Sequence, residues 1–241
     1  MSFVSVKLSG RLGNNVFQIM TTIAHALKHN AEYKIPSFTK SKYTKNCPFD
    51  QFPKLTAEDE KRIEYEHYQD GWDYKEIPYK PNMRISGWYQ NYQYFDKYRK
   101  EIIEVFNLPK EKIDAVAVHV RRGDFKRYPT KHPILEKQYY EKAQTVVHTL
   151  NNRVCHIFSD DESVKNEFRA DEYFINGAPL DDWIKMTQYR YFIIANSTYS
   201  WTAAYLSGSD NVIAPYPDRW SGIDNKKIYT GELIPKNWIT V

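Results

Sequence analysis

Cysteine is scarce in this sequence: among 241 residues only Cys47 and Cys155 occur, and neither belongs to a C-x-x-C pair. A disulfide framework or a cysteine-based zinc site is therefore not expected, and we infer a reducing compartment. No apolar run approaches the roughly 20 residues that a membrane span needs, and the Met1-Ser2-Phe3 start does not resemble a signal peptide. These absences predict a soluble, cytoplasmic protein without stable membrane insertion.

A large excess of charge of either sign is also missing. The 34 Lys and Arg residues nearly balance the 30 Asp and Glu residues, which leaves a net charge of +4. This balance argues against nucleic acid as a partner, although it allows a mildly basic pocket for an acidic metabolite. No cluster of Asp, His or Cys has the spacing of metal ligands, so we expect an activity that needs no metal ion and no other cofactor.

Regular hydrophobic spacing is present near the N-terminus. Residues 3–8 alternate like a strand, and a loop with two glycines, Gly10 and Gly13, follows. A helix is predicted next, because apolar residues recur at three- and four-residue spacing from Val16 to Leu27. The backbone N–H groups at such a helix start favour anions, which makes Gly13 and Asn14 candidate ligands of an anionic donor. The alternative is that the loop is only a turn.

Residues 36–81 show little sustained periodicity and predict irregular structure with short elements, such as one at residues 56–63. A strand is expected at residues 83–86 and a helix at about residues 96–106. The aromatic cluster between them contains Trp88, Tyr89 and Tyr92. Such rings suit the apolar faces of sugars, and the alternative is a packing hub within the core.

Beyond Pro109 the predicted strands and helices alternate with short loops. This alternation indicates a parallel sheet with helices on both faces. We expect strands at residues 115–120, 154–158, 172–175, 191–195 and 212–214, and helices at residues 137–150, 162–168, 180–189 and 201–206.

Polar loops follow three of these strands, and in a doubly wound sheet all three would meet at one crevice. The first loop carries Arg121 and Arg122, and guanidinium groups are well shaped to hold a diphosphate. The alternative for this pair is a solvated surface position. The second loop contains Asp160 and Asp161, one of which hydrogen-bonds a base or ribose, or caps a helix. The third, residues 196–200, opens a helix with hydroxyl groups that suit phosphate oxygens.

Five blocks of the sequence follow one another in a specific order. They are Gly10-Arg11-Leu12-Gly13-Asn14-Asn15-Val16-Phe17-Gln18, Gly87-Trp88-Tyr89-Gln90 with Tyr94-Phe95, His119-Val120-Arg121-Arg122-Gly123-Asp124, Phe158-Ser159-Asp160-Asp161, and Ile194-Ala195-Asn196-Ser197 with Ser200-Trp201. In this order and at this spacing the blocks resemble those of the α-1,2-fucosyltransferases of glycosyltransferase family eleven. The chain departs from the family in being short and in reading Trp201-Thr202-Ala203-Ala204 where a second tryptophan and a glycine are usual.

The resemblance implies an α/β fold of the GT-B type, with two Rossmann-like halves that face a cleft. It also implies GDP-fucose as the donor, inverting transfer without a metal ion, and an arginine on the donor diphosphate. We expect an N-terminal acceptor-side domain at residues 1–110, which carries the glycine loop. A C-terminal domain at residues 111–241 is expected to bind the GDP-sugar.

The resemblance also assigns roles by position. Arg121 becomes the diphosphate clamp, with Arg122 beside it or in a structural ion pair. Asp124 is the candidate acceptor of the proton from the acceptor hydroxyl. The other predicted donor-binding residues are Gly13, Asn14, His119, Asp160, Asn196, Ser197, Thr198 and Ser200. The predicted acceptor-binding residues are Trp88, Tyr89 and Tyr92, and the predicted acceptor is a terminal galactoside or a similar sugar.

Two other functions stay open at this point. One is a related fucosyltransferase that acts on protein or on another hydroxyl position. The other is a non-catalytic glycan- or nucleotide-binding module, which the aromatic residues favour but the paired arginines at a strand end do not. The sequence names neither the glycan nor the oligomeric state.

Overall fold

The structure of the chain is a computed structural model, which describes residues 1–37, 48–151, 154–224 and 232–241. The chain divides into two compact units, Met1–Leu108 and Pro109–Val241. This division lies near the domain boundary expected after residue 110. Cys47 lies outside the described residues, and Cys155 is buried in the C-terminal unit.

The N-terminal unit is built on a parallel sheet of four strands with the order β2-β1-β4-β3. The strands are β1 Phe3–Val6, β2 Glu32–Lys34, β3 Tyr65–Tyr68 and β4 Met83–Ser86. Helix α1, Leu12–Lys28, connects β1 to β2. Its apolar residues Val16, Phe17 and Met20 are fully buried, as their spacing predicted.

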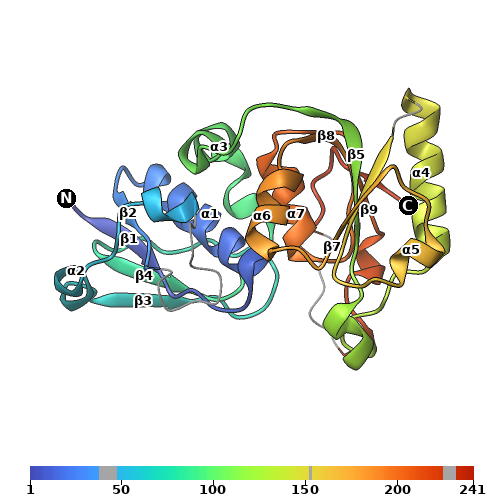
Figure 1. The fold of residues 1–241 in the computed structure, drawn as a ribbon. Coiled ribbons are helices and arrows are strands. Elements are labelled where there is room, and N and C mark those ends of the chain that lie inside the picture. Colours follow the sequence, from blue (N-terminus) through green and yellow to red (C-terminus); the bar gives the residue numbers. More distant parts are fainter. Residues whose placement is uncertain (38–47, 152–153, 225–231) are drawn as a thin grey trace. The chain divides into compact units, whose positions relative to one another are not determined.

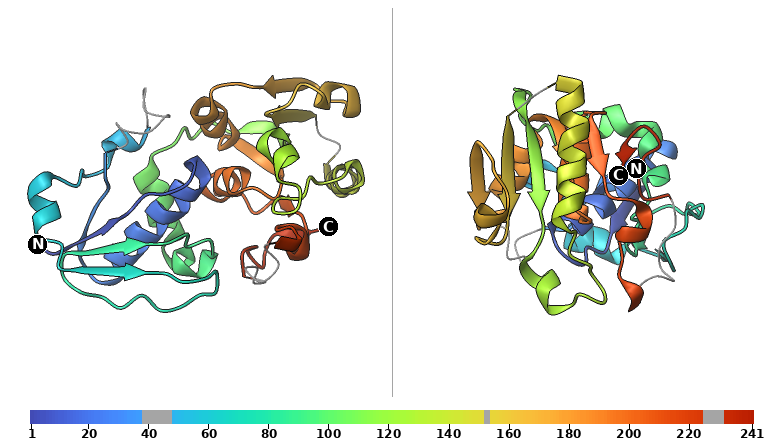
Figure 2. Two further views of the ribbon diagram at one scale, coloured as in Figure 1. Left: turned by 90° about the horizontal axis from the view of Figure 1, so that it is seen from below. Right: turned by 90° about the vertical axis from the view of Figure 1, so that its right-hand side faces the viewer.

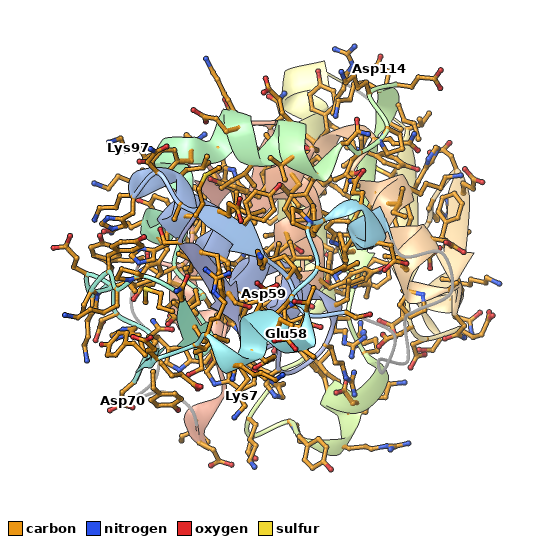
Figure 3. The ribbon with its side chains drawn as sticks, turned by 90° about the vertical axis from the view of Figure 1, so that its left-hand side faces the viewer. Lys7, Glu58, Asp59, Asp70, Lys97 and Asp114 are labelled. Carbon is orange, nitrogen blue, oxygen red and sulfur yellow. The ribbon has the colours of Figure 1, made fainter. Side chains whose placement is uncertain are left out.

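Among the residues that the structure describes, the N-terminal unit contains five shorter helices. They are η2 Pro48–Gln51, α2 Ala57–Lys61, η3 Tyr92–Tyr94, η4 Asp96–Tyr98 and α3 Arg99–Phe106. Helix α2, on which Figure 3 labels Glu58 and Asp59, begins at a capping box. In this box the Thr56 hydroxyl accepts the N–H of Asp59 and the Asp59 carboxylate accepts the N–H of Thr56. The single helix expected at residues 96–106 is instead the 3₁₀ turn η4 followed by α3, which ends at the left-handed residue Asn107.

The C-terminal unit contains a parallel sheet of six strands with the order β10-β9-β8-β5-β6-β7. The strands are β5 Ile113–Val120, β6 Cys155–Ser159, β7 Glu172–Ile175, β8 Tyr189–Ile193, β9 Val212–Ala214 and β10 Ile239–Thr240. The helices are η5 Gly123–Arg127, α4 Lys137–Asn151, α5 Val164–Glu167, α6 Pro179–Met186, α7 Thr198–Leu206 and η6 Pro217–Arg219.

Side chains of β5 alternate between the two faces of this sheet. Val116, Val118 and Val120 belong to one hydrophobic cluster with Ala143 of α4. His119 points to the other face, where it contacts α7. Figures 1 and 2 show α4 along one side of the sheet and α6 and α7 along the other. The predicted parallel sheet with helices on both faces is therefore confirmed.

Three strands were not expected from the sequence: β2, β3 and β10. Each lies at an edge of its sheet, and its side chains are half-buried or exposed. An edge strand with so few buried side chains carries no apolar run that would indicate it. Some predicted bounds were also displaced. β8 begins at Tyr189 instead of 191, because α6 ends at Met186 and not at residue 189.

The order of the strands creates one topological switch point in each sheet. After β5 the chain adds β6 and β7 on one side, then returns to the other side of β5 as β8 and continues outward as β9 and β10. The loops after β5 and β8 therefore leave neighbouring strands in opposite directions, which is where open α/β sheets bind ligands. The corresponding switch point of the N-terminal sheet lies between β1 and β4.

Candidate functional site

Arg121 is the first residue after β5, and its guanidinium is held from three sides. Its Nη2 group donates to the Asp124 carboxylate and its Nη1 group pairs with that of Asp160. The guanidinium carbon lies 5.4 Å from the centroid of the Phe125 ring. The Arg121 side chain is still 19% exposed. An anionic ligand can reach this group, and its two parallel N–H donors match phosphate oxygens.

Asp160 joins the β6 end to the loop that carries Arg121. Its Oδ1 atom accepts the backbone N–H groups of Arg122 at 2.9 Å and of Gly123 at 3.1 Å. A Cβ atom on Gly123 would lie 2.0 Å from Oδ2 of Asp160, so this approach of the two loops requires a glycine. Asp160 was predicted to bind the donor, and its observed partners all belong to the protein.

Arg122 points away from these groups and forms an ion pair with α5. Its Nη2 atom lies 2.7 Å from Oε2 of Glu167, and its side chain is only 13% exposed. Of the two alternatives left open by the sequence, the structure supports the structural ion pair. Contact between Arg122 and the donor stays a prediction.

The loops after β5 and β8 are joined by a buried hydrogen bond. Nδ1 of His119 lies 2.8 Å from Oγ of Ser200, in the first turn of α7. Burial, together with a smaller effect of the Arg121 guanidinium, lowers the pKa of His119 to about 3, so the imidazole is neutral at pH 7. Both residues were predicted to bind the donor. Their side chains are buried and bonded to each other, so neither offers an exposed surface to a ligand.

In the third polar loop, residues 196–200, some side chains are buried and others are half-buried. Asn196 is buried, and its Nδ2 donates to the carbonyl oxygens of Pro133 at 2.8 Å and Arg219 at 3.3 Å. Its amide therefore holds loops together, which corrects its predicted role in donor binding. Ser197 caps α7 by accepting the N–H of Tyr199. Ser197 and Thr198 are half-buried, and their contact with a donor stays a prediction.

Asp161, not Asp160, bonds to the N-cap residue of α5, Ser163, which itself makes no side-chain capping bond. Its Oδ1 accepts the N–H of Ser163 at 2.9 Å, and its Oδ2 pairs with Lys126. These contacts lower the pKa of Asp161 to about 2, with the Lys126 pair as the largest cause. The two neighbouring aspartates thus have separate partners.

The sequence did not indicate Asp182, a half-buried carboxylate in the first turn of α6. Burial raises its pKa, and the neighbouring Asp181 raises it further. The helix start lies beside α7, because the Tyr199 hydroxyl donates to the Pro179 carbonyl at 2.6 Å. No pattern indicated this residue, since acidic side chains are ordinary at helix N-termini.

In the N-terminal unit a single amide joins the loops after β1 and β4. Gln18 is fully buried, and its Oε1 accepts the N–H of Ser9 at 3.0 Å. Its Nε2 donates to Oγ of Ser9 at 2.9 Å and to the Gly87 carbonyl at 2.8 Å. This role of Gln18 was not predicted from the sequence, where the signal for it was a polar residue among the apolar positions of the helix.

The predicted anion ligands Gly13 and Asn14 lie in the first turn of α1. Gly13 is buried, and Oδ1 of Asn14 accepts Nε2 of Gln90 at 3.0 Å. Gly10 precedes the helix with φ of 79°, and a Cβ atom there would lie 2.9 Å from the Trp88 ring. The glycine loop is therefore packed against Trp88, and its contact with a donor stays a prediction.

The aromatic cluster separates into exposed and buried members. Trp88 is 38% exposed and Tyr92 is half-buried, so both can contact a ligand. Tyr89 has φ of 51° and is fully buried, with its ring edge-on to Tyr94 at a centroid distance of 5.2 Å. The prediction that Tyr89 stacks on an acceptor sugar is wrong, because its ring belongs to the core.

Among the described residues, no group of three or more His, Cys, Asp or Glu side chains is arranged to hold a metal ion. No helix within the described ranges is long and apolar enough to cross a membrane.

Comparison with known proteins identifies the family. The model of glycosyl transferase family 11 matches residues 2–239. An alpha-1,2-colitosyltransferase of Escherichia coli is 28% identical over an alignment of 297 residues, gaps included, which covers 100% of this chain and 99% of the relative. Galactoside alpha-(1,2)-fucosyltransferase 2 of Oryctolagus cuniculus is 26% identical over 247 residues, which cover 86% of this chain and 68% of the relative.

The fold has a match among solved structures. A mutant of Arabidopsis thaliana FUT1 in complex with GDP superposes with a TM-score of 0.52 at 11% identity, over 97% of this chain and 74% of that one. This likeness concerns the fold, an α/β architecture of the GT-B type with Rossmann-like halves. Because the family model spans nearly all of the sequence, the chain belongs to glycosyl transferase family 11 and is a glycosyltransferase.

Proposed function

We propose that this glycosyltransferase moves L-fucose from GDP-fucose to a hydroxyl group of a terminal galactoside and forms an α-1,2 linkage. The observation that carries the proposal is Arg121, a partly exposed guanidinium at a sheet switch point that two carboxylates orient. The names of the Escherichia coli and Oryctolagus cuniculus relatives support the α-1,2 linkage. The GDP complex of the Arabidopsis thaliana protein supports the nucleotide.

The proposed reaction is a single displacement with inversion. The acceptor hydroxyl oxygen bonds to the anomeric carbon while the bond between that carbon and the diphosphate oxygen breaks. The electron pair of the broken bond leaves with GDP, and Arg121 stabilises the negative charge that develops there. The proton of the hydroxyl passes to the Asp124 carboxylate. In this scheme the donor diphosphate takes over N–H groups of Arg121 that Asp124 accepts in the structure.

Colitose is a second candidate for the sugar that the donor carries. The Escherichia coli relative is named for colitose, which lacks the 3-hydroxyl group of L-fucose, and its alignment spans the whole of this chain. A site that hydrogen-bonds the 3-hydroxyl group would reject GDP-colitose, whereas a site without that contact would accept both donors. A direct comparison of the two donors decides between them.

The experiment that tests the proposal is acceptor-dependent release of GDP by the purified full chain. GDP-fucose and GDP-colitose are each incubated with lactose or N-acetyllactosamine, with an unglycosylated protein, and with no acceptor. We expect GDP release that requires the galactoside, and a product whose new linkage is α-1,2 by nuclear magnetic resonance. Binding of GDP-fucose without turnover on any acceptor would instead support a non-catalytic module. Preference for GDP-colitose would correct the donor.

A further inference from the structure

We propose that Asp160 is a positioning residue, which holds the Arg121 guanidinium in a fixed orientation and does not itself contact the nucleotide. The inference rests on the proposed function, because it concerns the group that receives the leaving diphosphate. It replaces the prediction that this carboxylate binds the base or the ribose of the donor.

The strand register brings Asp160 to the Arg121 loop. β5 and β6 are paired in parallel with Val120 opposite Ser159, so the two strands end at the same level. The hydroxyl of Ser159 donates to the Val120 carbonyl at 2.8 Å, which fastens the strand ends to each other. The residue that follows β5 is Arg121, and the residue that follows β6 is Asp160. Their proximity follows from the pairing of the sheet.

Both oxygens of the Asp160 carboxylate are engaged by the Arg121 loop. Oδ1 accepts two successive backbone N–H groups, at 2.9 Å from Arg122 and 3.1 Å from Gly123. Oδ2 pairs with Nη1 of Arg121. The backbone bonds fix the carboxylate, and the fixed carboxylate fixes the guanidinium, because a planar donor group aligns with the plane of its acceptor.

Gly123 lies close to the Asp160 carboxylate, whose side chain is 27% exposed. The position of a Cβ atom on Gly123 would be 2.0 Å from Oδ2 and 2.8 Å from Cγ of Asp160. Any side chain at position 123 would therefore displace the carboxylate from the guanidinium. Gly123 has ordinary backbone dihedrals, so its role is the close approach. This provides a second way to disturb Asp160 without changing its charge.

If Asp160 is a positioning residue, its substitution should lower kcat without lowering the affinity for diphosphate or for guanosine. Replacing the Asp160 carboxylate by an amide removes a negative charge beside the anion site, so ground-state affinity for a diphosphate is retained or increased. The guanidinium nevertheless loses its orientation, and misplacement of a reacting group by about 1 Å costs roughly 100-fold in rate. A residue that touched the nucleoside would instead lose affinity for guanosine when altered.

The test compares Asp160→Asn with Asp161→Asn as a matched control. Asp161 is adjacent and carries the same charge, but its partners are Lys126 and Ser163. For each protein the melting temperature, kcat and KM for GDP-fucose, and calorimetric affinities for inorganic diphosphate and for guanosine are measured. We expect Asp160→Asn to lower kcat roughly 100-fold while both affinities are maintained. Asp161→Asn should keep kcat within about threefold, with a lower melting temperature.

The result that overturns the inference is a tenfold or greater loss of guanosine affinity in Asp160→Asn, or a kcat within threefold of wild type in the folded variant. If Asp160→Asn does not fold, Gly123→Ala decides: we expect lower kcat with guanosine affinity maintained, and unchanged kcat would refute the proposal. Failure of the proposed function looks different. In that case the wild-type chain itself would not turn over GDP-fucose with any acceptor, and the inference would fall with it.

Discussion

Nδ1 of His119 lies 2.8 Å from the hydroxyl oxygen of Ser200, although one residue belongs to β5 and the other to α7. Both side chains are buried, and the His119 ring also lies near Tyr199 with a centroid distance of 5.3 Å. The bond joins the two loops that diverge at the switch point. A neutral imidazole at this place adds no positive charge beneath Arg121, since burial lowers the pKa of His119 to about 3.

Ser200→Ala is expected to destabilise the protein by about 1–3 kcal/mol, because a buried ring nitrogen of His119 loses its partner. Thermal unfolding followed by circular dichroism measures the change. Thr145→Ala is the control, since this hydroxyl lies on the exposed side of α4 and also bonds within its own helix. That variant should remain within about 0.5 kcal/mol of wild type. Equal stability of the two variants would mean that the His119 bond contributes nothing.

Arg121→Lys is expected to reduce kcat for GDP-fucose on the order of a hundredfold or more, since an ammonium group cannot reproduce two parallel N–H donors. Arg121→Ala, which removes the positive charge altogether, should lower stability as well. The structure places Arg121 between the carboxylates of Asp124 and Asp160, so this substitution leaves two neighbouring negative charges that the guanidinium had balanced.

Arg122→Ala is the comparison for this prediction. Its ion pair with Glu167 is partly exposed, so we expect a loss of about 1 kcal/mol or less and a smaller loss of kcat than at Arg121. Steady-state kinetics and melting temperatures of the two variants distinguish the roles. Near-normal turnover in Arg121→Lys would show that this loop is not the leaving-group site.

Trp88→Ala is expected to raise the acceptor KM severalfold with little change in melting temperature, because this ring is exposed and is predicted to stack on the apolar face of the acceptor sugar. Tyr89→Ala should instead lower stability by about 3–5 kcal/mol, as for other large aromatic residues removed from a core. Acceptor titrations at saturating donor, together with thermal melts, measure both effects. An unchanged KM in a folded Trp88→Ala protein would place acceptor binding elsewhere.

The N-terminal unit is expected to lose stability as the pH falls from 6.5 toward 4. His25 is buried on α1, and its pKa is lowered from 6.5 to about 4, mainly by burial and to a smaller extent by His29, Lys28 and His67, with an opposing effect of Glu76. The unfolded chain therefore binds a proton in this range that the folded chain refuses, so the stability present above pH 6.5 is lost on acidification.

His25→Gln tests this pH dependence, because the amide keeps polarity and does not titrate. The variant should show a shallower loss of melting temperature between pH 6.5 and 4.5 than wild type. The pKa values of Asp59 and Asp161 are lowered to about 2, so protonation of these carboxylates reduces stability at lower pH. Between pH 6.5 and 4.5 the loss of stability is therefore expected from the histidines. Identical slopes for variant and wild type would exclude His25 as the titrating group.

Transfer of the sugar is predicted to proceed in the presence of EDTA. A guanidinium and backbone N–H groups can stabilise a leaving diphosphate without Mg²⁺, as fixed donors do at other developing charges. GDP release is measured with EDTA and, as a control for nonspecific effects, with EDTA already saturated with Mg²⁺. Activity that disappears with EDTA and returns with Mn²⁺ would contradict the prediction.

The sequence by itself determined the parallel α/β class, helix α1 and the arrival of Arg121 at a strand end. These features depend on local signals, namely apolar periodicity and the residues that follow a buried run. Strand β4 and strands β7 and β9 fell at their predicted residues. The five blocks resembling glycosyltransferase family eleven also identified the family, which the match over residues 2–239 confirmed.

The tertiary structure determined which side chains become partners of one another around Arg121. Asp160 approaches Arg121 only because β6 pairs beside β5 in one register, and His119 meets Ser200 only because β8 takes the other side. Likewise, the conformation of Tyr89 turns one ring of the aromatic cluster inward while Trp88 stays exposed. Local patterns do not contain strand order or register, since both result from the packing of segments far apart in the chain.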